Sequence, residues 1–206
     1  MSSDTWSLIQ ITSLAAIAPT FIILMISTRL NDLRERRESM QNLASELGFT
    51  YRFKDPAFWN AGFRRIPFLS GWRINKEIGG VMHGSIVGTE SWLFDYRCFG
   101  LSSPGKDTIG DINKYTVAVF RFGAGQVPPF VMDSIINPYP VSQKIFHHPL
   151  ISRLRGTWTL QCDGEWLSLT RYNGYRSYTD SDIESYRTFF AEATEIAKQM
   201  PGVFSA

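Results

Sequence analysis

The sequence predicts an α+β protein: an N-terminal transmembrane helix, then an antiparallel β-sheet domain that ends in a long helix. Three observations support this prediction. The 24 residues between Asp4 and Arg29 carry no charge. Short segments of alternating apolar and polar residues follow, separated by Gly-rich or polar connections, and an apolar stripe at helical spacing ends the chain. A strongly bent sheet closed by that helix, as in pleckstrin-homology-like barrels, is a specific version of this fold.

The uncharged segment has the length and composition of a membrane span. Residues 8–27 read LIQITSLAAIAPTFIILMIS, and about 20 mostly apolar residues cross the hydrocarbon core of a bilayer. A buried core helix would show a polar face at helical spacing, which this segment lacks. A cleaved signal peptide would begin with basic residues, whereas the flank MSSDTW has an acid and no Lys or Arg. We therefore expect residues 8–27 to remain in the lipid bilayer as an anchor.

The basic residues close to this span all follow it: Arg29, Arg34, Arg36 and Arg37. Lys and Arg beside a span stay on the cytoplasmic side. We therefore expect a single-pass protein of the inner (plasma) membrane with its N-terminus outside. Residues 1–28 would form the tail and the transmembrane helix, residues 29–48 a juxtamembrane helix, and residues 49–206 a cytoplasmic α+β domain.

The juxtamembrane segment carries one apolar stripe, made of Leu30, Leu33, Met40, Leu43 and Leu47. Gly48 is a typical C-terminal stop for such a helix. The stripe also fits a short coiled-coil seam, although Arg37 would occupy a core position of that seam. We expect the stripe to pack on its own domain, with self-association of the chain as the alternative.

Strands are predicted around residues 49–53, 72–75, 81–87, 91–98 and 115–122. In the segment 91–98, alternation places two sets of side chains on opposite faces: Trp92, Phe94, Tyr96 and Cys98 on one, and Leu93, Asp95 and Arg97 on the other. We expect the aromatic face to be the core.

The segment TWTLQC-DG-EWLSLTR predicts a hairpin in which Asp163-Gly164 forms a two-residue turn. In that register Leu160 faces Leu167.

A long helix is predicted at the end of the chain, where Ser181 and Glu184 match a capping box. The helix that follows has one apolar stripe and is expected to end at Pro201. The stripe consists of Ile183, Tyr186, Phe190, Ala193, Ala197 and Met200.

Several functional classes find no support in the sequence. The net charge of +2 provides no basic field for nucleic acid. The string GLSSPGKD has the spacing of a phosphate loop, but Asp107 stands where a hydroxyl should ligate magnesium. The three histidines lack the spacing of metal ligands, and the two cysteines are expected to be free thiols in strands. We therefore expect no cofactor, no metal and no assigned catalytic residue.

The best candidates for binding are Asp95, Arg97, Arg121, Tyr172 and Tyr175. Asp95 lies among aromatic residues, so if its face is covered we expect Arg97, Arg121 or backbone donors to offset its lost hydration, and we favour a structural salt bridge over a catalytic role. The two tyrosines flank a polar connection, and rigid aromatic rings suit interfaces. We expect a non-enzymatic domain that binds a protein or lipid partner. The alternative is an unrecognised enzyme with Asp95 in a pocket.

At a few short motifs the chain resembles a set of uncharacterised, single-pass bacterial membrane proteins. The motifs are Leu47-Gly48-Phe49, Phe94-Asp95-Tyr96, the segment TVAVFR and the Pro129-Phe130 step. The likeness extends to the closing hairpin and helix, while residues 101–114 and 134–156 depart from the pattern. This resemblance implies a bacterial membrane location and an unassigned activity, with no catalytic residues to transfer.

Overall fold

The computed structural model describes residues 3–54, 58, 62, 66, 74–86, 88–99, 112–123, 125–132, 148–154, 157–172 and 183–205. For residues 3–20, 29, 74–77, 98–99, 112–114, 172 and 205 it describes the backbone alone. The chain divides into two compact units, Met1–Ser39 and Met40–Ala206.

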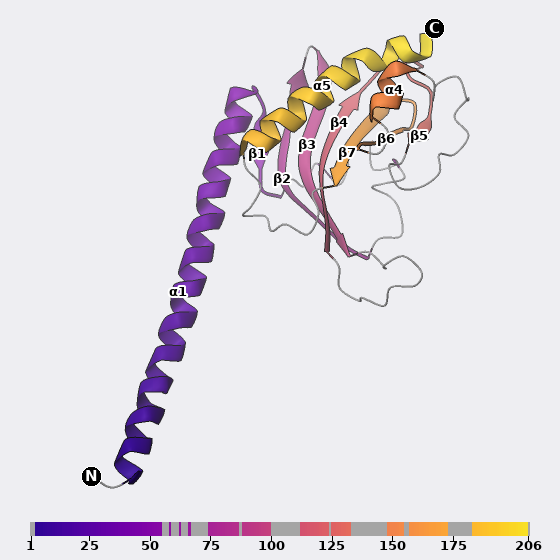
Figure 1. The fold of residues 1–206 in the computed structure, drawn as a ribbon. Coiled ribbons are helices and arrows are strands. Elements are labelled where there is room, and N and C mark those ends of the chain that lie inside the picture. Colours follow the sequence, from indigo (N-terminus) through magenta and orange to yellow (C-terminus); the bar gives the residue numbers. More distant parts are fainter. Residues whose placement is uncertain are drawn as a thin grey trace, which may run out of the picture. The chain divides into compact units, whose positions relative to one another are not determined.

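Helix α1 runs without interruption through Ser3–Glu46, so the predicted transmembrane and juxtamembrane segments belong to one helix (Figure 1). The apolar stripe predicted for residues 29–48 is buried in one part and exposed in another. Met40 and Leu43 are each 1% exposed, whereas Leu30 and Leu33 are 60% and 45% exposed. Gly48, with φ of 71°, follows the helix as predicted, and its N–H donates to the Ser45 carbonyl.

The second unit is built on one antiparallel sheet of seven strands, in the order β1-β2-β3-β4-β7-β6-β5. The strands are β1 (Thr50–Arg52), β2 (Ile74–Ile86), β3 (Thr89–Phe99), β4 (Ile112–Arg121), β5 (Phe130–Met132), β6 (Thr159–Cys162) and β7 (Trp166–Tyr172). Two further helices complete the described part, α4 (Pro149–Leu154) and α5 (Ile183–Ser205). The α+β class, the antiparallel sheet and the long C-terminal helix are therefore confirmed.

Strand β2 corrects the prediction of separate strands around residues 72–75 and 81–87. The chain continues as one strand from Ile74 to Ile86, with register shifts against β3 between Ile74 and Glu77 and between Gly79 and Met82. Gly80 has φ of 63°, which an L side chain rarely adopts. The pair Gly79-Gly80, which resembled a connection between two strands, is thus an irregularity within one long strand.

Both faces of the central strands are buried, which corrects the expectation of a single core face. Leu93 is fully buried and belongs to the main core, whereas Phe94 is fully buried in a second cluster on the opposite face. The aromatic face of β3 is therefore covered as predicted, but the larger core lies on the other side.

The main core lies between the sheet and α5, which crosses one face of the strands (Figure 1). Phe190 stacks on Phe120 of β4 with ring centroids 6.1 Å apart, and it meets Phe49 edge-on at 5.4 Å. The last turns of α1 contribute Met40, Leu43 and Ala44 to the same core. Arg187 of α5 also pairs with Glu46 at 2.5 Å.

The second cluster lies on the opposite face and consists of Phe58, Ile66, Val81, Trp92, Phe94, Tyr96, Val117, Val119 and Trp166. Phe58 meets Phe94 edge-on with centroids 4.7 Å apart. Ile66 is fully buried. Two residues from the long connection between β1 and β2 therefore cover this face of the sheet.

The predicted hairpin exists, but its register is two residues away from the prediction. Leu160 pairs with Leu169, not with Leu167, because the turn spans four residues. The Asp163 carboxylate accepts hydrogen bonds from the N–H groups of Glu165 and Trp166 at 3.0 and 2.7 Å. This side-chain bonding holds a wider turn than the two-residue form. A shift of two residues leaves every side chain on its predicted face.

Helix α5 buries the predicted stripe from Tyr186 to Met200, with Ile183 partly buried, but it does not end at Pro201. The helix continues to Ser205 with the proline inside it. Val203 is 7% exposed and Phe204 lies 5.3 Å from the ring of Phe130, so apolar contacts hold the last turn. Tertiary packing here overrides the helix-breaking tendency of proline. Ser181 of the predicted capping box lies outside the described residues.

Gly84 is expected to be required for the packing of Phe49. A Cβ at this position would overlap the Phe49 ring, so Gly84→Ala should destabilise the second unit by about 1–3 kcal/mol. Urea unfolding of the purified protein measures the effect. Gly202→Ala is the control, because its Cβ would meet no atom within 4 Å and alanine favours the helix. Equal midpoints for the wild type and Gly84→Ala would contradict this packing.

Candidate functional site

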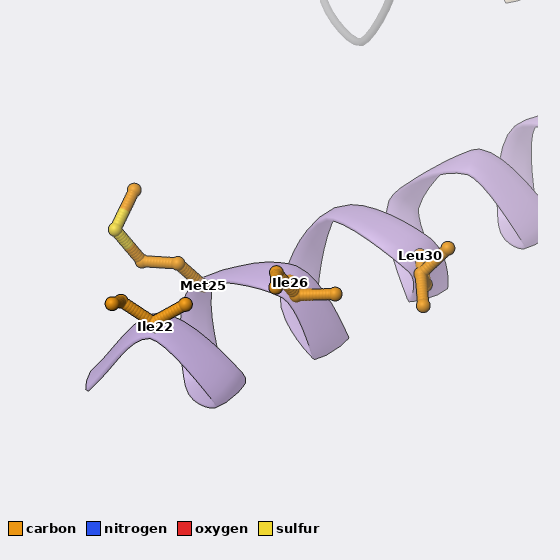
Figure 2. Close-up of a pocket in the computed structure, with 4 residues that line it drawn as sticks. All are labelled: Ile22, Met25, Ile26 and Leu30. Carbon is orange, nitrogen blue, oxygen red and sulfur yellow. The ribbon is translucent and has the colours of Figure 1, made fainter. Parts of the chain in front are cut away.

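The first candidate site is an apolar surface on α1. Six consecutive large apolar residues are 48–67% exposed: Phe21, Ile22, Ile23, Leu24, Met25 and Ile26. Consecutive residues of a helix point about 100° apart, so six of them cover its whole circumference. Figure 2 shows part of this surface, where Ile22, Met25, Ile26 and Leu30 line a shallow hollow. We call residues 21–26 the apolar belt.

The polar residues that follow the belt bond back to the helix. Ser27 donates to the Leu24 carbonyl at 2.9 Å, and the Thr28 hydroxyl lies 3.0 Å from the carbonyls of Leu24 and Met25. Such bonding satisfies a hydroxyl without water. Arg34, further along, pairs with Glu38 at 3.0 Å.

Among the residues that the structure describes, no helix is long and apolar enough to be a candidate membrane span. The side chains of residues 8–20, the larger part of the predicted span, lie outside those residues.

The structure places Asp95 on the sheet face that α5 covers, where it is 6% exposed. It is paired across the sheet with Gly79 and Thr116, and Thr116 is paired with Arg171 of β7. Arg97 is two residues further on, on the same face of β3. Asp95 and Thr116 are therefore buried polar neighbours on the α5 face of the sheet, while Arg97 and Arg171 beside them are partly exposed.

Arg121 was one of the alternatives expected to offset the burial of Asp95, and the structure removes it from that set. It lies on the opposite face of the sheet, where its Nε and Nη2 contact one oxygen of Glu165 at 2.8 and 2.7 Å. Its Nη1 donates to Glu90 at 3.3 Å. Its guanidinium lies 5.4 Å from the centre of the Trp166 ring. These contacts raise the pKa of Arg121, with the hydrogen bond to Glu165 as the largest cause.

Glu90 extends this network to β2. Its Oε1 accepts a hydrogen bond from the Trp92 indole at 3.3 Å and lies 3.2 Å from Nε2 of His83. The His83 ring stacks on the Trp92 ring with centroids 3.9 Å apart. We call this set the Arg121 cluster: His83, Glu90, Trp92, Arg121, Glu165 and Trp166.

The Arg121 cluster is a layer of ionisable side chains over two buried tryptophans. Trp92 and Trp166 are 3% and 4% exposed, while the side chains of His83, Glu90, Glu165 and Arg121 are 34–51% exposed. Sequence analysis missed this grouping because the members lie far apart along the chain. The one local signal was the spacing of Glu90 and Trp92, which puts both on one face of a strand.

Several candidates from the sequence lie outside the described residues. They are Tyr175, the side chains of Tyr172 and Cys98, the segment GLSSPGKD and His147.

His148 is described, and its Nδ1 accepts a hydrogen bond from the Leu150 N–H at 3.2 Å at the start of α4. Within the described residues no group of three or more metal-ligating side chains comes together. Gly123 and Gly125 lie in a turn, with the Gln126 N–H donating to the Gly123 carbonyl.

Cys162 is a buried free thiol at the end of β6. Burial raises its pKa to about 11, although a hydrogen bond from the Gly164 N–H opposes that shift. A thiol with so little thiolate near neutral pH is a poor nucleophile. Cys162 therefore belongs to the core, as the sequence predicted.

Comparison of the chain with protein-family models, curated proteins and solved structures found no match.

Cys162 is expected to resist alkylation in the folded protein. Because burial and the raised pKa of about 11 suppress the thiolate, iodoacetamide at pH 8 should modify Cys162 at least roughly tenfold more slowly than in urea. Mass mapping of the Cys162 peptide measures both rates and separates this thiol from Cys98. Equal rates in the two conditions would contradict the burial of Cys162.

The same thiol gives the stability a pH dependence. Its folded-state pKa is raised above that of the unfolded chain, so its contribution is complete below the unfolded value and is lost as the pH rises through about 11. Urea midpoints measured across that range should fall less steeply in Cys162→Ala than in the wild type.

Proposed function

We propose that the chain is a single-pass membrane protein whose N-terminal helix anchors a non-enzymatic domain for binding a partner. The observation that carries the anchor is the apolar belt of residues 21–26, exposed on every side of α1. It continues an uncharged sequence that begins after Asp4, and residues 8–27 have the length of a hydrocarbon core.

Lipid fits this belt better than a protein surface does. A helix that packs on a domain needs one apolar stripe, as the buried Met40 and Leu43 illustrate further along α1. Apolar side chains around the full circumference leave no side for water, and a bilayer surrounds a helix completely. The back-bonding of Ser27 and Thr28 also suits a helix end near a medium that supplies few hydrogen bonds.

The proposed orientation has the N-terminus outside and residues 49–206 in the cytoplasm of a bacterial cell. Arg34, Arg36 and Arg37 follow the span within about ten residues, and no basic residue precedes it. The positive-inside rule counts these residues and gives little weight to the acids among them.

The role of the second unit is proposed to be the binding of a protein or lipid partner. Both faces of its central strands are filled with side chains, so the sheet serves as a rigid support for its loops and its margins. The segment from Tyr172, the last residue of β7, to Tyr175 remains the proposed contact region, since rigid aromatic rings bind with little loss of conformational freedom. We propose that the sheet is strongly bent, as in pleckstrin-homology-like barrels. The seven antiparallel strands followed by α5 support this proposal.

The anchor is tested by charged substitutions in pairs. Ile17→Arg with Ile22→Arg should release the protein from washed membranes, because each charge costs about 2.5–3.5 kcal/mol near the centre of a span and less near its ends. Immunoblotting of carbonate-washed membranes measures the retained fraction.

The matched control is Leu30→Arg with Leu33→Arg, which makes the same change at two exposed positions beyond the span. This control should stay in the membrane fraction. Wild-type protein that remains in the supernatant after ultracentrifugation without detergent would overturn the anchor.

The orientation is tested with reporters fused after Ala206. Green fluorescent protein should fluoresce and alkaline phosphatase should be inactive, because a cytoplasmic C-terminus supports the first reporter only. Replacing Arg29, Arg34, Arg36 and Arg37 together by Gln should weaken this preference by removing the charge bias. An active phosphatase on the unchanged chain would reverse the proposed topology.

Partner binding is tested by photo-crosslinking in native membranes. A crosslinking amino acid at Tyr175 should give one reproducible adduct, whereas the same amino acid at Thr188, on the exposed side of α5, should not. If neither position gives a reproducible adduct, the binding role fails while the anchor stands on its own test.

A further inference from the structure

We draw no further inference here: the strongest candidate, the Arg121 cluster on the sheet face opposite α5, has ionisable side chains that pair with one another, and nothing in the described part of the structure shows which ligand or partner would cover it.

Discussion

The second unit depends on a sheet whose central strands bury apolar side chains on both faces. In β3, Leu93 and Phe94 are neighbours in sequence, and each is fully buried in a different cluster. Each face then needs its own cover, because exposed apolar area costs about 25 cal/mol per Å². Helix α5 and the last turns of α1 cover one face, while Phe58 and Ile66 cover the other. The same constraint buries some polar residues of the central strands, including Asp95 and Thr116.

The local periodicity of apolar residues was enough to predict most helices and strands. It did not predict the positions of irregular backbone within a strand or at a turn. The alternation was confirmed from Trp92 to Tyr96, and the helical stripe was confirmed from Tyr186 to Met200. Two errors have the same origin, since the Gly79-Gly80 pair and the Asp163-Gly164 pair each resemble a standard turn. In the structure the first forms an irregularity in β2 and the second a wider turn held by the Asp163 carboxylate. Tertiary contacts decide whether such a pair forms a standard turn or an irregular one. Those contacts cannot be deduced from the local pattern of a single sequence.

The contacts of the candidate polar residues were even harder to predict from the sequence than the turns. Alternation within one strand fixes which of its residues share a face, but it says nothing about which face of the next strand lies beside it. The pairing of Asp95 with Thr116 puts Arg121, five residues later in β4, on the other face. Arg121 therefore contacts Glu90 and Glu165, which no local pattern connected to it.

Helix α1 shows that the angular distribution of apolar residues, not their number, determines what a helix can contact. Between residues 21 and 26 every position is apolar and exposed, so no single protein face could cover them all. From Met40 to Ala44 the buried residues share one side, and polar residues occupy the rest of the helix surface. One continuous helix thus carries two surfaces suited to two surroundings, with Leu30 and Leu33 exposed among charged residues between them. A stripe can be buried by the chain that carries it, as Met40 and Leu43 are, whereas a complete apolar belt extends beyond what one protein face can cover.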